Sequence, residues 1–192
     1  MKFIRRLFFL LLLWGAVAAV PVAFLVYSHF PVRYMDIIQE HAGNLEPAFI
    51  LAVIHAESTF RPQVVSHRGA MGLMQIMEPT GEWIAQMKGL EGFETYQLFT
   101  PEINIAIGVY FLNWLWHRYD GDITLILSGY NAGIGRVNEW LADYQFSYDG
   151  ETLAHIPFPE TRTYIQRVER NMIIYEWLLK FDAWRSEIYN MR

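Results

Sequence analysis

Apolar residues recur at helical spacing through most of the chain after residue 33. In residues 46–58, Ile50, Val53 and Ile54 share one helical face, with Leu51 beside them. Thr100-Pro101 supplies an N-cap and a first-turn proline, which predicts a helix start. The apolar stripe of that helix is formed by Ile103, Ile107, Tyr110, Phe111, Trp114 and Leu115.

Further helices are predicted after each loop. The pattern indicates a turn running into a helix over residues 72–87, a short helix capped by Asp122 and ending near Gly129, a helix over Ile134–Leu141 and a long one from Glu160 to Phe181. No segment of useful length alternates strictly between apolar and polar residues. We therefore predict an all-α domain without a sheet of any size.

The N-terminus differs from the rest of the chain. Lys2, Arg5 and Arg6 precede residues 7–26, which carry no charge and are long enough to cross a bilayer core of about 30 Å as a helix. Basic residues before the run favour an N-terminus in the cytoplasm. We predict a signal anchor over residues 1–33 and a separate folded domain over residues 34–192. The alternative is a cleaved signal peptide with a small-residue site at residues 16–18.

Composition excludes several classes of site. The 192 residues contain no cysteine, which rules out disulfides, lipoprotein attachment and thiolate metal sites. The whole chain has a net charge of −5 while residues 1–33 carry +4, so residues 34–192 carry −9. An acidic domain without a basic patch is a poor candidate for nucleic acid, which is bound through cations at its phosphates. We predict no nucleic-acid partner, no metal and no other cofactor.

Glu57 is the first candidate for chemistry. It ends an apolar helical run, where apolar neighbours and the partial negative charge of the helix C-terminus both disfavour the ionised carboxylate. Both effects raise its pKa, as a general acid near neutral pH requires. A lone glutamate at a helix end is more often simply exposed. Gly69 and Gly72 soon after it indicate a turn that needs left-handed backbone or close approach.

Four sequence motifs that occur in order give stronger evidence of function than any one of these residues alone. They are Ala56-Glu57-Ser58; Ser66-x-x-Gly69-Ala-x-Gly72-Leu-Met-Gln75-Ile76; Gly129-Tyr130-Asn131-Ala132-Gly133-x-Gly135-Arg136-Val137; and Ile156-Pro157-Phe158-Pro159-Glu160-Thr161-Arg162-x-Tyr164-Ile165. Residues 98–108 also match, at a helix start. The pattern resembles the catalytic domain of the family 1 lytic transglycosylases, the soluble lytic transglycosylase type, over roughly residues 35–181.

The resemblance implies an all-α, lysozyme-like (goose-type) fold with a groove for glycan. It implies Glu57 as the catalytic acid and base. Residues that it places along the groove as substrate-binding groups are Ser66, Gln75, Met77, Tyr130, Asn131, Glu160 and Tyr164. Two departures stand out: Gly129 replaces an alanine that is frequent in the family, and Glu78-Pro79 displaces a proline by one position and adds a carboxylate.

The implied reaction cleaves the bond between N-acetylmuramic acid and N-acetylglucosamine in peptidoglycan. Most glycosidases use two carboxylates, yet no motif places a second one opposite Glu57; Glu78 and Glu160 are candidates only by proximity. The sugar's own C6 hydroxyl would then close a 1,6-anhydro ring. A muramidase that uses water on the same fold remains an alternative, as does a non-catalytic peptidoglycan-binding anchor of a wall-spanning assembly.

The anchor and the resemblance together predict a location. A single-pass protein of the inner membrane would hold the catalytic domain in the periplasm, where it meets peptidoglycan strands. Partners in cell-wall or secretion machinery, the cellular role and the oligomeric state stay open at this point.

Overall fold

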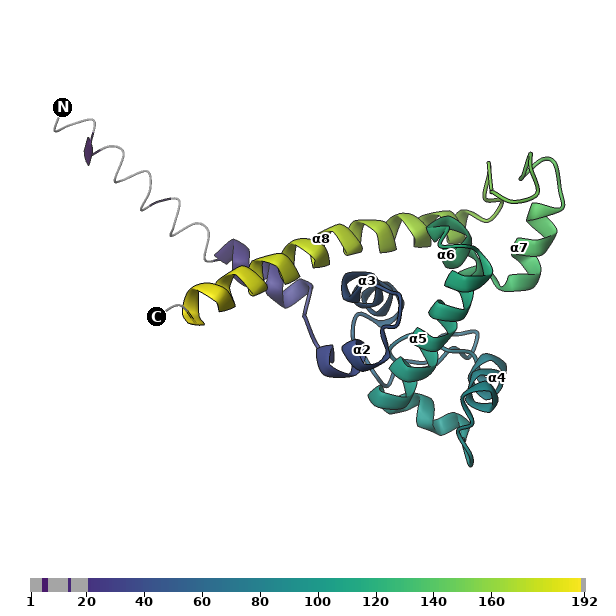
Figure 1. The fold of residues 1–192 in the computed structure, drawn as a ribbon, viewed down its shortest axis with the longest axis horizontal. Helices are drawn as coiled ribbons and strands as arrows, with labels where there is room; N and C mark the ends of the chain where they lie inside the picture. Colours follow the sequence, from purple (N-terminus) through teal and green to yellow (C-terminus); the bar gives the residue numbers. More distant parts are fainter. Residues whose placement is uncertain (1–4, 7–13, 15–20, 191–192) are drawn as a thin grey trace. The chain divides into compact units, whose positions relative to one another are not determined.

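A computed structural model of the chain describes residues 5–6, 14 and 21–190, with side chains up to Glu187 (Figure 1). The chain divides into two units, Met1–Arg33 and Tyr34–Arg192. In the smaller unit, residues 21–29 are helical. Most of the predicted anchor, residues 7–26, lies outside the described residues. Among the residues that the structure describes, no helix is both long and apolar enough to cross a membrane.

The larger unit is built from helices. They are α2 (Met35–His41), α3 (Pro47–Ser58), α4 (Glu78–Lys88), the 3-10 helix η1 (Thr95–Phe99), α5 (Pro101–Arg118), α6 (Ile123–Ala132), α7 (Ile134–Leu141) and α8 (Pro159–Asn190). Extended pairing in the described residues is limited to two isolated bridges, Val65 with Met71 and Met71 with Ile76. The predicted all-α class is confirmed.

Helix α3 lies at the centre of this unit and delivers Glu57. Every residue from Ala48 to His55 is buried, so the helix is apolar all round rather than on one face. It packs most extensively against α8, which passes over it in Figure 1. Helices α2 and α6 both pack on α5. Helix α3 is therefore held by α8 and α2, and Glu57 lies at the end of its buried run.

Helix starts agree with the sequence better than helix ends do. Helix α5 begins after Thr100 and α6 after Asp122, whose carboxylate accepts the N–H of Leu125 at 2.9 Å. Helix α6 continues to Ala132 instead of ending near Gly129. A Cβ on Gly129 would lie 3.0 Å from Leu115 and 3.1 Å from Tyr119, so this glycine permits close helix packing and does not end the helix.

Candidate active site

Glu57 is the penultimate residue of α3, and the helix ends immediately after it. Thr59 and Phe60 both have left-handed backbone, with φ of 51° and 59°, and the N–H of Thr59 donates to the carbonyl of His55 at 3.1 Å. Left-handed backbone is unfavourable for a β-branched or aromatic residue. Such local strain is tolerated where packing fixes the chain, and it is frequent beside functional groups.

Burial raises the pKa of Glu57 from 4.5 to about 7. An interaction with the Tyr164 hydroxyl lowers this pKa, and the positive charge of Arg167 lowers it further, but neither offsets the loss of solvent. The predicted direction is therefore the one observed, with desolvation as its main cause. At neutral pH a substantial fraction of Glu57 is protonated, as a general acid requires.

Two tyrosines lie beside Glu57. Tyr164 is only 2% exposed, and its hydroxyl lies close enough to the Glu57 carboxyl group to lower the pKa of that group. The Tyr130 hydroxyl donates to the carbonyl of Met74 at 2.7 Å. Burial and the charge of Glu57 raise the pKa of both tyrosines well above 10. Both hydroxyls therefore stay neutral and can act as hydrogen-bond donors.

The turn between α3 and α4 forms a wall next to these groups. A Cβ on Gly72, which has φ of +78°, would lie 2.2 Å from the Leu98 carbonyl oxygen, so only glycine fits there. Gln75 has φ of 49°, and its amide donates to the carbonyls of Val64 at 3.1 Å and Gly72 at 2.9 Å. The Ser66 hydroxyl oxygen accepts the N–H of Ala70 at 3.0 Å. Ser66 and Gln75 therefore brace the turn in this structure.

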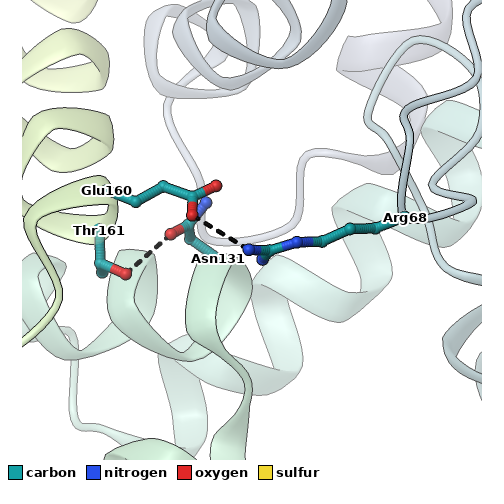
Figure 2. Close-up of polar contacts among 4 residues, drawn as sticks. All are labelled: Arg68, Asn131, Glu160 and Thr161. Atoms are coloured by element: carbon teal, nitrogen blue, oxygen red, sulfur yellow. Dashed lines mark hydrogen bonds and ion pairs between the residues drawn. The ribbon is translucent and has the colours of Figure 1, made fainter.

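Asn131 and Glu160 take part in separate contacts at the start of α8 (Figure 2). Asn131 accepts a hydrogen bond from the Thr161 hydroxyl at 2.9 Å, which ties the end of α6 to α8. Glu160 lies 3.3 Å from the guanidinium of Arg68, and both side chains are about two-thirds exposed. This ion pair joins the Ser66–Gly72 turn to α8 across the surface.

A cleft of about 440 Å³ lies beside Tyr130. Met77, which is 41% exposed, lines it together with Tyr130 and Asn131. The rings of Trp83 and Phe111 also line this cleft. The structure thus brings Met77, Tyr130 and Asn131 to one cleft. Tyr164 instead lies buried beside Glu57, and Glu160 lies in the surface ion pair.

The other candidate carboxylates have partners of their own. Glu78, which follows Met77, accepts the Thr95 hydroxyl at 2.8 Å, and Glu160 pairs with Arg68. The groups that shift the pKa of Glu57 are a tyrosine and an arginine, with no carboxylate among them. The described residues therefore offer one carboxyl group with a strongly raised pKa at this site.

Sequence reasoning missed several residues that shape the site. Asn104 is fully buried; its amide oxygen accepts the N–H of Met74 at 2.7 Å, and its nitrogen donates to Met71 at 3.0 Å and Leu98 at 2.7 Å. The sequence signal for Asn104 is a single asparagine inside an otherwise apolar helical stripe. Arg167 follows Tyr164 by three residues and so shares its helical face. Nothing local indicated the Arg68–Glu160 pair, whose members are 92 residues apart.

Comparisons with known proteins identify the family of the chain. The family model described as the transglycosylase SLT domain matches residues 35–151. The chain is 32% identical over 163 residues to the soluble lytic murein transglycosylase of Escherichia coli K12, covering 81% of this chain and 25% of that protein. It is also 35% identical over 127 residues to the membrane-bound lytic murein transglycosylase C of Histophilus somni, covering 59% of this chain and 35% of that protein.

Solved structures give the same fold. The 70 kDa soluble lytic transglycosylase of Escherichia coli superposes with a TM-score of 0.70 at 29% identity, over 80% of this chain and 26% of that one. An inactive glutamate-to-glutamine mutant of lytic transglycosylase Slt from Pseudomonas aeruginosa gives 0.68 at 35% identity, over 79% and 25%. The predicted lysozyme-like fold is thereby confirmed. The chain spans about a quarter of the length of these proteins, and it belongs to the transglycosylase SLT domain family.

Proposed function

We propose that this protein is a lytic transglycosylase that cleaves peptidoglycan strands, with Glu57 as its single acid and base. One observation carries the proposal: Glu57 is half-buried beside Tyr164 and Arg167, desolvation raises its pKa to about 7, and no second carboxylate is among the groups that shift it. The names of the relatives support the reaction class, and the Pseudomonas aeruginosa enzyme is inactive with glutamine in place of a glutamate.

The proposed reaction begins with proton transfer. Protonated Glu57 donates to the glycosidic oxygen between N-acetylmuramic acid and N-acetylglucosamine, and the bond from that oxygen to C1 breaks. The muramic N-acetyl group stabilises the positive charge at C1. Ionised Glu57 then takes the proton of the C6 hydroxyl, and the oxygen of that hydroxyl forms a new bond to C1. The product is a 1,6-anhydro ring, water is not consumed, and Glu57 regains its proton.

The neighbours of Glu57 have roles in this scheme. The neutral Tyr164 hydroxyl and the charge of Arg167 favour ionised Glu57 after the first transfer, and burial favours the protonated form before it. Tyr130 and Asn131, with Met77, would contact the reacting sugar in the cleft. Ser66 and Gln75 would shape the turn that faces it. Glu160 would bind a substrate group at the edge of the groove after its pair with Arg68 opens.

The predicted anchor completes the proposal. With residues 7–26 in the inner membrane, the catalytic domain would act on peptidoglycan from the periplasmic side. The membrane-bound relative from Histophilus somni is consistent with this location. A carbonate wash of membranes from cells that express the full chain tests it. An integral anchor keeps the protein in the pellet, and release into the supernatant would contradict an uncleaved anchor.

The decisive experiment is mass spectrometry of the fragments released from purified sacculi by the full chain in detergent. A transglycosylase releases anhydro-muropeptides, each lighter by one water than the product of a muramidase. Glu57→Gln should lower the rate by at least about 10²–10⁴-fold while sacculus binding is retained. Glu176→Gln removes a carboxylate from the surface of α8 and serves as the control with unchanged activity.

The outcomes separate the alternatives. Reducing ends in place of anhydro ends would identify a muramidase on the same fold. A non-catalytic peptidoglycan anchor would bind sacculi without releasing fragments, and Glu57→Gln would leave that binding unchanged. Either result would overturn the proposed reaction.

A further inference from the structure

A second and larger hollow lies on another side of α5. It has a volume of about 840 Å³ and lies where α2, α4 and α5 end. Its lining includes the cations Lys88 and Arg118 and the aromatic rings of Tyr110 and Trp114. The motifs found in the sequence include none of these four residues, and the proposed reaction does not use them.

The charge of this hollow contrasts with that of the domain. No aspartate or glutamate lines it, although residues 34–192 carry −9. The ammonium group of Lys88 lies 5.0 Å from the Tyr110 ring centre, and the guanidinium of Arg118 lies 5.4 Å from that of Trp114. Arg118 also donates to the amide oxygen of Asn138 at 3.2 Å.

Helix C-termini attract cations through their partial negative charge, and this accounts in part for the basic residues here. It does not account for their gathering around one hollow that no carboxylate lines. Cations placed this way attract anions electrostatically, and a guanidinium can bind a carboxylate through two parallel hydrogen bonds.

The walls of the hollow are held in place. Asn113 of α5 accepts the N–H of Asn44 at 3.2 Å and donates to the Ala42 carbonyl at 2.9 Å. Gly43 has φ of +60°, and a Cβ there would lie 2.8 Å from the Asn113 side-chain oxygen. The turn after α2 is thus fixed against α5 by hydrogen bonds to the Asn113 side chain, next to a glycine with left-handed backbone. The hollow is a preformed feature of the fold.

One pair of indole rings separates the hollow from the cleft beside Tyr130. Trp83 lines the cleft and Trp114 lines the hollow, and their ring centres are 5.2 Å apart at 83°. Trp83 also contacts Phe111, which contacts Tyr130. The cleft and the hollow are therefore adjacent across this pair of rings.

We propose that this hollow binds the carboxylates of the peptide stem carried by a glycan strand whose sugars occupy the cleft. The proposal rests on the proposed function, because peptidoglycan supplies both parts of the ligand. N-acetylated sugars linked to a peptide carry no charge of their own, so the anionic groups of the strand are the carboxylates of its peptides. The aromatic rings would pack against the apolar parts of the stem.

The test compares two substrates in one assay with the full chain. Strands that carry tetrapeptide stems and strands stripped of peptide by an amidase are digested, and anhydro ends are counted by mass spectrometry. The double variant Lys88→Gln/Arg118→Gln should lower the ratio of the rate on peptide-bearing strands to the rate on stripped strands by on the order of tenfold. Lys180→Gln, which removes an exposed cation of α8, should leave the ratio unchanged.

Each outcome bears on one proposal. If the wild type forms no anhydro ends from either substrate, the proposed function fails. If the wild type is active and the double variant keeps the wild-type ratio, or loses both rates equally, the peptide site is overturned. A free acidic tetrapeptide should inhibit cleavage of peptide-bearing strands by the wild type more than inorganic phosphate at the same concentration. The reverse order would identify a phosphate site and also overturn the proposal.

Discussion

At the scale of single residues, the proton affinity of Glu57 links stability to chemistry. Glu57 is half-buried, and the Tyr164 hydroxyl and Arg167 recover only part of the solvation that its carboxyl group loses on folding. A buried carboxyl group held in this way costs stability when it ionises. The same cost raises the pKa of Glu57, which suits the proposed role of this residue as an acid near neutral pH.

Glu57→Gln should stabilise the fold at alkaline pH. A carboxyl group whose pKa rises on folding binds its proton more strongly in the folded chain. Its contribution to the free energy of unfolding is therefore fully present below about pH 4.5 and is lost as pH rises through about 7. Denaturant unfolding should show the variant more stable by about 2–3 kcal/mol near pH 8.5 and nearly equal to the wild type near pH 4. A difference that does not change with pH would contradict the assignment.

Tyr164→Phe should extend activity to higher pH. The Tyr164 hydroxyl is the largest interaction that lowers the pKa of Glu57, so its loss raises that pKa above about 7. Because Glu57 must be protonated to act, the alkaline fall of kcat/KM should move to higher pH, with a smaller movement in the same direction for Arg167→Gln. Arg170→Gln, an exposed change on α8, is the control. A profile that moves to lower pH would refute this role.

At the scale of elements, the Gly69–Ile76 turn is positioned by the start of α5. The side chain of Asn104 bonds three backbone groups, those of Met71, Met74 and Leu98. Met74 in turn accepts the Tyr130 hydroxyl at the end of α6. One buried asparagine thus links the wall of the site to the tyrosine of the cleft. The helical pattern predicted the helix that carries Asn104 but gave no information on what the amide contacts.

Asn104→Ala should therefore destabilise the domain strongly. It leaves the Met74 N–H and the Leu98 carbonyl without their bond to the asparagine, while the Met71 carbonyl keeps the N–H of Ile76. Unsatisfied buried groups cost about 1–3 kcal/mol each. We expect a loss of about 3 kcal/mol or more in thermal or denaturant unfolding. Asn138→Ala, on the exposed face of α7, should change stability by less than about 0.5 kcal/mol. Equal effects of the two changes would show that Asn104 is not an organising residue.

At the scale of the whole molecule, the core belongs to the larger unit. The buried apolar side chains of the described residues begin at Ile38 and end at Leu178. Exposed apolar side chains also lie on α8, including Trp177 and Trp184, at 58% and 55%. The residues that form the site all lie within the range of the core.

Residues 34–192 should consequently fold and act without the preceding segment. We expect a melting temperature within about 2 °C of that of the full chain in the same detergent, because no described residue before Ile38 is buried. Activity on solubilised strands should also be retained. Loss of the cooperative transition on removal of residues 1–33 would contradict this division of the chain.

Much of the fold was predictable because its signals are local. Thr100-Pro101 and Asp122 start helices through contacts within one turn, and the order of helices follows from apolar spacing. The end of α6 was misplaced because Gly129 serves packing against Leu115 and Tyr119, which the local sequence does not reveal. Helix α8 extends beyond its apolar pattern. It continues to Asn190, although the last buried residue among its described side chains is Leu178.

The sequence by itself determined the helical class and the family, and it led to the prediction of Glu57 as the catalytic residue. The signals for these conclusions are an apolar helix that ends in a carboxyl group and four ordered motifs, and each signal lies in residues that are neighbours along the chain. Only the tertiary structure decided that Tyr164 is buried beside Glu57, that Thr161 holds Asn131, and that Trp83 meets Trp114. These partners are about 30 residues or more apart in the chain. Their contacts depend on how whole helices pack, and the spacing of residues along one helix does not specify that packing.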